Sequence, residues 1–255
     1  MPYKNIKKYQ QVLQLWETNK NKSKIAQITK LDRGTVRKII NNYGTVAQLE
    51  EAIGLSPIKY EFESHQSYKK SYAYILGIYL GDGYINKTLR TWKLRIFQDK
   101  KYINVVKEIE ENLKIIFPYN RTNKISHGKN CYEIYIYNNN IIELFPQHDK
   151  GKKYKRKIKL ETWQEEIINE FPFLFIKGLI HSDGCSYISK SNKKEYLNYG
   201  FCNKSFDIIN LLINSLNKVN ISYNLYFNKN KEIYRLSIVK RKSVNFLYKK
   251  IGIKE

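Results

Sequence analysis

Two aspartates recur at matched positions in this sequence, and each is followed by a glycine. Asp82 lies in the stretch YILGIYLGDGYI, and Asp183 lies 101 positions further on, in FIKGLIHSDGCSYI. Both stretches are apolar and rich in small residues, as expected of a buried helix that needs no carboxylate at its end. Carboxylate oxygens are ligands for hard divalent cations such as Mg²⁺. The duplication therefore favours a shared metal site, although Asp-Gly is also a common turn pair.

Small residues in the same two stretches indicate how the aspartates could be brought together. Gly77 and Gly81 lie four apart on one helix face, as do Gly178 and Ser182. Glycine inside a helix costs about 0.5–1 kcal/mol relative to alanine, so its presence on matching faces suggests close packing of two backbones. We expect the helices to cross at a pseudo-two-fold axis. Their carboxylates would then repel each other and the helix C-termini, and a cation would relieve that repulsion.

Carboxylates that bind Mg²⁺ beside a basic surface are typical of phosphodiester hydrolysis, where the metal activates water and stabilises the leaving oxygen. The chain supplies the basic surface, because 46 Lys and Arg against 23 Asp and Glu give a net charge of +23. Such an excess disfavours compaction, and a polyanionic partner is the simplest reason for it. A zinc site at His181 and Cys185 is the weaker reading, because two ligands do not complete one.

The composition also excludes several classes of protein. A hydrophobic fraction of 42% with 14% aromatic residues is typical of a folded chain. No apolar run reaches the roughly 18 residues of a membrane-spanning helix, and the N-terminal stretch MPYKNIKKYQ lacks the apolar region of a signal peptide. Three cysteines without a CxxC motif argue against a disulfide framework. We therefore expect a soluble protein of the cytoplasm, with no membrane partner.

Residues 1–50 are predicted to form an all-α helix-turn-helix domain. Apolar residues at helical spacing predict a first helix in IKKYQQVLQLWE. Ser23 and Asp32 are expected to cap two short helices, with a tight turn at residues 30–32 and Gly44 as the final stop. The second of them suits a DNA major groove, and a solvated basic face is the alternative. Its predicted DNA-binding residues are Arg33, Thr35, Arg37 and Lys38.

From residue 71 onward the chain reads as two repeats, 71–148 and 170–255, each in the order α-β-β-α-β-β-α. The predicted fold is therefore α/β (α+β), with two pseudo-symmetric repeats and antiparallel sheets. A connector is predicted at 51–70 and a basic linker at 149–169. The linker begins DKGKKYKRKIKL, with seven basic residues and one acidic residue, and is expected to follow phosphates. Its predicted DNA contacts are Lys152, Lys153, Lys155 and Arg156.

The paired motifs resemble those of the LAGLIDADG homing endonucleases in their single-chain, two-repeat form. ILGIYLGDG and IKGLIHSDG keep the spacing, the central glycine and the terminal Asp-Gly, although the sixth position is Leu80 or His181. The resemblance covers residues 71–255. The added helix-turn-helix, and the basic linker that runs into LETWQEEI, are similar to a bacterial and phage subset of that family.

The resemblance implies that each sheet saddles duplex DNA and reads its bases. It implies that Asp82 and Asp183 hold divalent metal, helped by the backbone carbonyls of Gly81 and Ser182. Mg²⁺ would be the cofactor, with Mn²⁺ as a replacement and Ca²⁺ as a non-catalytic substitute.

The resemblance further implies a basic or amide residue near each scissile phosphate. Matching of segments selects Lys240 in the second repeat, where the first repeat has the uncharged Asn138. Gln98 and Lys101 are the candidates at the strand-to-helix corner of the first repeat, and Asn203 and Ser205 are those of the second. The two half-sites are therefore expected to be unequal.

Alternation along the strands predicts which residues face the DNA. Arginine and asparagine are the expected readers of guanine and adenine edges, and a slip of one residue would reverse the assignment. The predicted readers are Arg90, Lys93 and Arg95 in the first repeat, and Asn198 and Asn228, with Tyr196 and Tyr226, in the second.

The site residues and the resemblance together predict a Mg²⁺-dependent DNA endonuclease. The resemblance implies that it cuts both strands of a long asymmetric site, leaves short 3′ overhangs and belongs to a bacterial or phage mobile element. A single chain with two repeats is expected to act as a monomer. Two alternatives on the same fold stay open at this point. One is a non-cleaving transcriptional regulator, and the other is a maturase that binds folded RNA.

Overall fold

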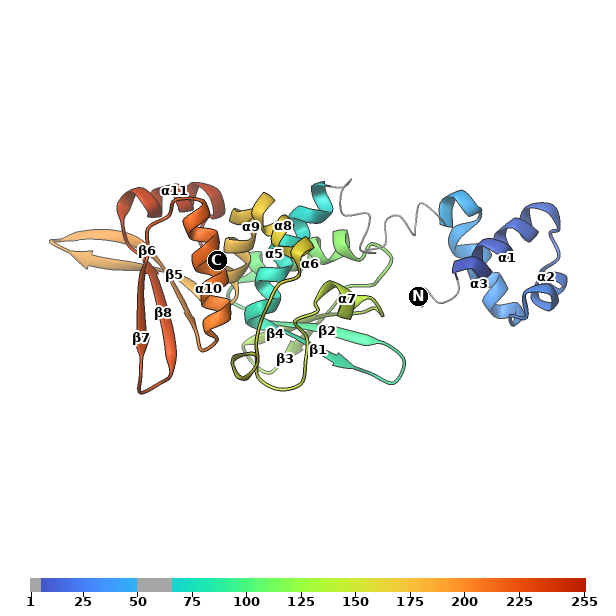
Figure 1. The fold of residues 1–255 in the computed structure, drawn as a ribbon, viewed down its shortest axis with the longest axis horizontal. Helices are drawn as coiled ribbons and strands as arrows, with labels where there is room; N and C mark the ends of the chain where they lie inside the picture. Colours follow the sequence, from blue (N-terminus) through green and yellow to red (C-terminus); the bar gives the residue numbers. More distant parts are fainter. Residues whose placement is uncertain (1–5, 50–65) are drawn as a thin grey trace. The chain divides into compact units, whose positions relative to one another are not determined.

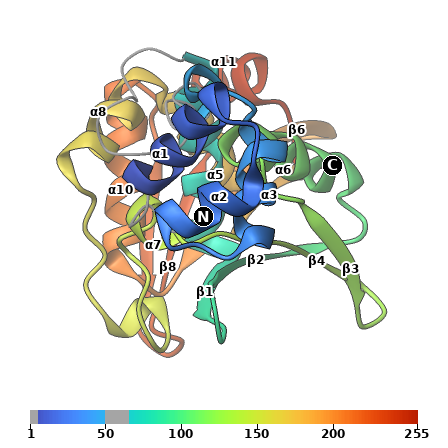
Figure 2. The ribbon, with the colours of Figure 1, turned by 90° about the vertical axis from the view of Figure 1, so that its right-hand side faces the viewer.

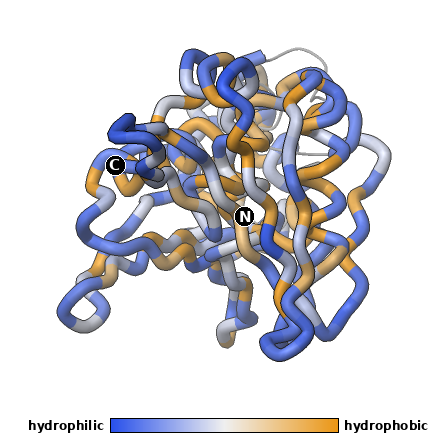
Figure 3. The backbone as a smooth tube through the Cα atoms, turned by 90° about the vertical axis from the view of Figure 1, so that its left-hand side faces the viewer, coloured by the Kyte–Doolittle hydropathy of each residue, from blue (hydrophilic) through white to orange (hydrophobic). Residues whose placement is uncertain are grey.

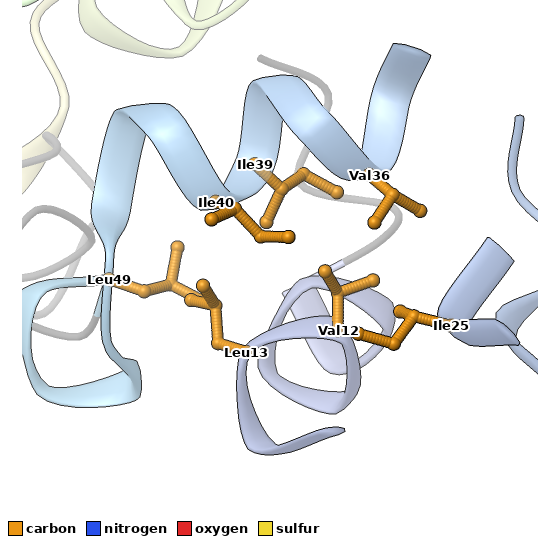
Figure 4. Packing of buried hydrophobic residues seen from close by; sticks show 7 residues of the cluster. All are labelled: Val12, Leu13, Ile25, Val36, Ile39, Ile40 and Leu49. Carbon is orange, nitrogen blue, oxygen red and sulfur yellow. The ribbon is translucent and has the colours of Figure 1, made fainter. Parts of the chain in front are cut away.

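The computed structural model describes residues 6–49 and 66–255, and the chain divides into two compact units, Met1–Ser64 and His65–Glu255. The first unit is helical, with α1 (Ile6–Thr18), α2 (Lys22–Thr29) and α3 (Arg33–Tyr43) (Figure 1). Apolar residues of all three helices meet in one small core (Figure 4). The buried members of this core are Val12, Leu13, Ile25, Val36, Ile39, Ile40 and Leu49.

The turn between α2 and α3 has the predicted length, but one of the two caps differs from the prediction. Asn21, not Ser23, caps α2, because its side-chain oxygen accepts from the backbone nitrogens of Ser23 and Lys24, each at 3.1 Å. Asp32 caps α3 as predicted and accepts from the backbone nitrogen of Thr35 at 2.8 Å. Asparagine and serine are equally good helix caps, so the residue type alone does not show which of the two is used. The cap is the residue directly before the helix, and α2 begins at Lys22.

The second unit contains the order αββαββα twice, as predicted. In the first repeat, helix α5 begins at Gln66, earlier than the expected residue 71. Its elements are α5 (Gln66–Asp82), β1 (Gly83–Lys87), β2 (Trp92–Asp99), α6 (Ile103–Ile116), β3 (Asn123–His127), β4 (Cys131–Tyr137) and α7 (Ile141–Leu144). Those of the second repeat are α9 (Pro172–His181), β5 (Gly184–Ser191), β6 (Lys194–Asn203), α10 (Phe206–Lys218), β7 (Asn224–Asn228), β8 (Ile233–Ile238) and α11 (Arg241–Ile251).

The segment predicted as a basic linker is only partly a linker. It contains a short 3₁₀ helix, Lys153–Lys155, and then helix α8, Thr162–Glu170. Glu161 and Gln164 form a capping box at the start of α8. The buried Gln164 side chain also donates to the hydroxyl of Tyr72 on α5 at 2.6 Å. The second half of the segment is therefore fixed against the helices that carry the repeated motifs.

Each repeat forms one antiparallel four-stranded sheet, with strand orders β1-β2-β4-β3 and β5-β6-β8-β7. Alternate residues such as Leu94 and Ile96 on β2, or Tyr199 and Phe201 on β6, are fully buried beneath the helices. The hairpin of β3 and β4 projects away from α5 and α6 (Figure 2), and the hairpin tips are hydrophilic (Figure 3). We call the side of each sheet that points away from the helices its outer face.

Helices α5 and α9 run side by side between the two sheets (Figure 1). At Gly77 a Cβ atom would lie 2.6 Å from the Phe175 carbonyl oxygen and 2.8 Å from the Leu179 nitrogen. At Gly178 it would lie 3.0 Å from the Ile78 nitrogen. These distances leave no room for a side chain, so the predicted close crossing of the two glycine-bearing helices is confirmed. Among the described residues, no helix has both the length and the apolar character needed to cross a membrane.

Candidate active site

The helix crossing brings the two repeated aspartates close to each other. Asp82 is the last residue of α5, and Asp183 follows Ser182, the C-cap of α9. Burial first, and the Asp183 carboxylate second, raise the pKa of Asp82 to about 7. Burial also raises the pKa of Asp183, whereas Lys153 and a hydrogen bond from Asn203 lower it. Both carboxylates are thus destabilised as anions, which is the environment in which a bound cation is most favourable.

Each aspartate is held by an amide from the second strand of its own sheet. Gln98 Nε2, on a side chain only 3% exposed, donates to Asp82 Oδ2 at 2.9 Å and to the His181 carbonyl oxygen at 2.9 Å. Asn203 Nδ2 donates to Asp183 Oδ2 at 2.7 Å. The structure therefore brings Gln98 to the site, as predicted, with Asn203 as its counterpart.

Two lysines occupy equivalent places at the C-terminal ends of the crossing helices. Lys153 Nζ donates to the carbonyl oxygens of Gly81 at 3.2 Å, Gly83 at 2.7 Å and Tyr79. Lys254 Nζ donates to those of Ser182 at 2.6 Å and Gly184 at 3.4 Å. Helix C-termini carry carbonyls without intrahelical donors and partial negative charge, so ammonium groups are stabilised there.

Burial lowers the pKa of both lysines, and the aspartates oppose that effect. The pKa of Lys153 falls to about 8, with Asp183 and then Asp82 acting to raise it. For Lys254 the order is reversed, with Asp82 the stronger carboxylate. The charge of Asp183 thus acts more strongly on Lys153, at the end of α5, and that of Asp82 acts more strongly on Lys254, at the end of α9.

Two cavities open on the site, one for each aspartate. The first, of about 630 Å³, is lined by Gly81, Lys153, Asp183 and Asn203 among others. The second, of about 410 Å³, is lined by the corresponding set, Asp82, Gln98, Ser182 and Lys254. Each cavity thus combines the aspartate of one repeat with the small residue before the aspartate of the other.

The residues of these cavities fit a hard divalent metal. The available donors are the carboxylates of Asp82 and Asp183 and the carbonyls of Gly81 and Ser182, which are all oxygen atoms and suit Mg²⁺. No group of three or more His, Cys, Asp or Glu residues gathers in the described part of the chain. Water or phosphate oxygens would therefore have to complete the coordination, and an ion at either carbonyl would share it with a lysine or displace that lysine. The zinc reading gains no support, because His181 and Cys185 belong to no group of three or more potential ligands among the described residues.

The structure corrects the prediction for Lys240. Strands β6 and β8 are antiparallel, with Asn203 opposite Tyr234 and Tyr199 opposite Ile238. Lys240 lies beyond Ile238, so it is at the end of the sheet remote from Asn203 and Asp183, roughly 13 Å or more along the strands. Lys254 lies at the site instead, where its Nζ donates to the Ser182 carbonyl oxygen at 2.6 Å. It follows Lys153 by 101 positions, the same spacing as the two aspartates, and this spacing is the signal that the sequence analysis missed.

Other predicted catalytic and linker residues lie around the site with different partners. Lys101 is exposed and pairs with Asp99 at 3.4 Å, and Ser205 caps α10. Arg156 donates to the carbonyls of Gln147, at 3.0 Å, and Asp149, so it braces its own loop instead of projecting toward a phosphate. Lys152 and Lys155 are exposed, as a phosphate contact requires.

Most of the predicted base readers do lie on the outer faces. In the first sheet Lys93 and Arg95 alternate with the buried Leu94 and Ile96, and Arg90 lies exposed in the loop between β1 and β2. In the second sheet Asn228 pairs with Ile233 at the end of the β7–β8 hairpin.

Asn198 is the exception among these predicted readers. It is only 2% exposed, because Arg241 donates to its side-chain oxygen and its nitrogen donates to Ser189 Oγ at 2.7 Å. Its amide is therefore not free to meet a base edge.

Three of the four DNA-binding residues predicted on α3 are exposed. Arg33, Arg37 and Lys38 are exposed on α3. Thr35 is partly buried, and its hydroxyl donates to the Asp32 carboxylate, so it contributes to the helix cap.

Comparison with known proteins finds a family model that matches the second repeat and solved structures that share the fold. Residues 170–252 match the model of the LAGLIDADG-like domain. Protein MJ0314 of Methanocaldococcus jannaschii is 26% identical over 165 residues, which cover 63% of this chain and 59% of that relative. A structure of mesophilic variants of the homing endonuclease I-DmoI covers 72% of this chain and 92% of that chain, at 17% identity and a TM-score of 0.53.

A second I-DmoI structure, a complex with DNA and Mn, covers 72% of this chain and 98% of that chain, at 18% identity and a TM-score of 0.52. At these identities the likeness shows the fold, two antiparallel four-stranded sheets joined by a central pair of helices.

Proposed function

We propose that this protein is a DNA endonuclease, because residues 170–252 match the model of the LAGLIDADG-like domain and the fold is similar to that of the homing endonuclease I-DmoI. It would cut both strands of a long asymmetric site with the help of a divalent metal. The observation that carries the proposal is the pair of half-buried aspartates at the helix crossing, each with its own amide and its own cavity. Because one chain supplies both aspartates, the protein would act as a monomer.

The residues of the site have distinct proposed roles. Asp82 and Asp183, with the carbonyls of Gly81 and Ser182, would hold Mg²⁺ or Mn²⁺, which when bound would polarise the phosphate and lower the pKa of a water molecule. Gln98 and Asn203 fix the orientation of the two carboxylates. Their amide groups accept as well as donate, so each could also hold a water molecule in its cavity.

Lys153 and Lys254 supply positive charge at the two cavities. A fixed ammonium near the scissile phosphate stabilises charge that develops on the leaving oxygen, without reorganisation during the reaction. The net charge of +23, the exposed Lys152 and Lys155, and the basic face of α3 would attract and hold the duplex.

The test is cleavage of a randomised duplex library with Mg²⁺, using the wild type and the Asp82→Asn/Asp183→Asn variant. We expect the wild type to cut a subset of sequences, and the variant to bind the same subset without cutting. Glu165→Gln/Glu166→Gln, two exposed changes on α8, is the control for lost negative charge and should cut like the wild type. Undiminished cutting by the Asp82→Asn/Asp183→Asn variant would refute the site.

A non-cleaving DNA-binding regulator is the second candidate. Two observations favour it, namely the separate helical unit that contains α3 and the lysines that already occupy the Gly81 and Ser182 carbonyls. In the same experiment a regulator would select specific sequences equally well with and without the two aspartates, and neither protein would cut.

A further inference from the structure

A buried carboxylate lies on the outer face of the first sheet, where the proposed function places DNA. Glu133, on β4, is 1% exposed. Its Oε1 accepts from Lys93 Nζ at 2.8 Å and from Arg95 Nε at 2.7 Å, and its Oε2 accepts from Arg95 Nη2 at 2.8 Å. A carboxylate on a surface that faces DNA repels the phosphates. Its presence there is therefore best explained by its effect on the two cations that it binds.

The two bonds from Arg95 leave one edge of its guanidinium available. Of the five N–H donors of an arginine, Glu133 takes one on Nε and one on Nη2. The remaining donors include one on each terminal nitrogen, and these two point in parallel away from the carboxylate. The side chain is 28% exposed and lies over the Phe97 ring, at 5.0 Å from its centroid. Arg95 therefore presents a fixed pair of donors.

Lys93 completes the cluster and is the less exposed of the two cations. Its ammonium lies 3.8 Å from the centroid of the Tyr135 ring, and its side chain is 15% exposed. Together the two cations and one carboxylate carry a net charge of +1, so the cluster as a whole still attracts DNA.

The second repeat has no such cluster at the corresponding positions. Gln98 pairs with Tyr132, and its counterpart Asn203 pairs with Tyr234. Counting along the strands from these pairs, Arg235 stands in the place of Glu133, and Gly200 in that of Arg95. The second sheet thus lacks both the carboxylate and the arginine that it would orient.

We propose that Glu133 is a positioning residue for base recognition, which holds Arg95 to read one guanine in the half-site beneath the first repeat. The fixed donor pair matches the O6 and N7 acceptors that guanine presents in the major groove. The equivalent base pair beneath the second repeat would be read with less discrimination. The inference rests on the proposed binding of duplex DNA but not on cleavage.

The test is selection of binding sites from a randomised duplex library, followed by affinity measurements on every single-base variant of the selected site. A bidentate arginine–guanine pair should give the wild type a preference of roughly 5- to 150-fold for guanine at one base pair. Glu133→Gln should reduce that preference to about twofold or less, and should leave every other base preference unchanged. Its binding to unrelated duplexes should be as tight as that of the wild type or tighter, because a negative charge is removed.

Arg95→Lys provides a second test that keeps the surface charge and does not depend on the folding of Glu133→Gln. It should lose the same base preference at the same position. Glu195→Gln is the matched control, since Glu195 pairs with Lys190 on the second sheet with both side chains mostly exposed. That control should keep the complete wild-type profile.

The outcomes separate this inference from the proposed function. A wild type that selects no sequence would overturn both. Sequence selection without any guanine preference sensitive to Arg95→Lys, or a uniform loss of affinity in Glu133→Gln, would overturn the role of Glu133 alone.

Discussion

At the residue scale, the site is defined by groups that are costly to bury and by the partners that offset that cost. Asp82 and Asp183 are half-buried next to each other, and the charges of Lys153 and Lys254 act on both of them. Neither lysine forms an ion pair with an aspartate in the structure, because each ammonium donates to backbone carbonyls instead. The negative charges of the two carboxylates are therefore only partly balanced, which agrees with the raised pKa values of both groups.

This incomplete compensation predicts a pH-dependent stability in the absence of metal. The pKa of Asp82 rises from 3.8 to about 7 on folding, so the folded state binds more protons and becomes relatively less stable as the pH rises through that range. His181, whose pKa burial lowers to about 3, acts in the opposite direction and is present in both proteins. Relative to the wild type, Asp82→Asn should therefore gain about 2–3 kcal/mol between pH 5 and pH 7.5. Urea unfolding in EDTA measures this difference, and a constant difference across the range would contradict the buried-anion account.

A second prediction at this scale concerns the choice of lysine. Lys254→Met should slow cleavage of the selected target roughly 100-fold, because it removes a preorganised positive charge from one cavity. Lys240→Met, at the remote end of the second sheet, should change the rate by less than about threefold, as expected for a surface substitution. Single-turnover cleavage with each strand labelled measures both. The Lys254→Met protein should accumulate a nicked duplex, since only one cavity is altered. A larger effect from Lys240→Met than from Lys254→Met would support Lys240 as the basic residue near the scissile phosphate.

At the scale of elements, the crossing of α5 and α9 determines where the aspartates lie. Gly77 and Gly178 permit backbone contact, and the last turns then place Gly81 against the Ser182 side chain and within reach of Asp183. The sheets follow directly from the helix ends, because β1 begins at Gly83 and β5 at Gly184. The same crossing thus fixes both the site and the starting point of the first strand in each sheet.

The helix crossing can be tested with a single methyl group. Gly77→Ala gains helix propensity of up to about 1 kcal/mol, but its Cβ would meet the Phe175 carbonyl oxygen at 2.6 Å. Overpacking of this kind typically costs about 1–3 kcal/mol, so we expect a net loss of stability and slower cleavage. Ser67→Ala, at an exposed position of the same helix, should be neutral or slightly stabilising. Urea unfolding compares the two variants, and a more stable Gly77→Ala protein would mean that the backbones are not in contact.

At the scale of the whole molecule, positive charge is present on both units. The chain carries +23 in total, and exposed basic residues lie on α3 as well as in the segment around Lys152 and Lys155. If both units bind one duplex, each phosphate contact contributes to the salt dependence of the affinity. Substitutions on one unit of the intact protein can therefore measure the contribution of that unit to the salt dependence.

The contribution of the helical unit that contains α3 is predicted from that salt dependence. Replacing Arg33, Arg37 and Lys38 with glutamine should reduce the slope of log affinity against log salt concentration by roughly 2–3. The control replaces three exposed lysines on the helical side of the second unit, Lys107, Lys114 and Lys218, with glutamine and should leave the slope unchanged. Fluorescence anisotropy on the selected duplex measures both, and equal slopes would show that α3 does not contact phosphates.

The sequence by itself determined the features that are recorded locally or by repetition. Sequence patterns alone predict the matched Asp-Gly pairs, the small residues of the crossing helices and the two αββαββα repeats. They also predict the alternation that places Lys93 and Arg95 on an outer face. Side-chain periodicity and spacing encode them directly.

Only the tertiary structure decided which distant residues meet. The antiparallel register of β6 and β8 carries Lys240 away from Asp183, while the end of the chain returns Lys254 to the helix terminus. Asn198 is covered by Arg241, and Glu133 binds two predicted base readers from a neighbouring strand. These contacts depend on how strands and chain segments far apart in the sequence are packed. The positions of Lys153 and Lys254 could also have been predicted from the 101-residue spacing of the sequence. The pseudo-two-fold axis gives equivalent positions of the two repeats equivalent surroundings.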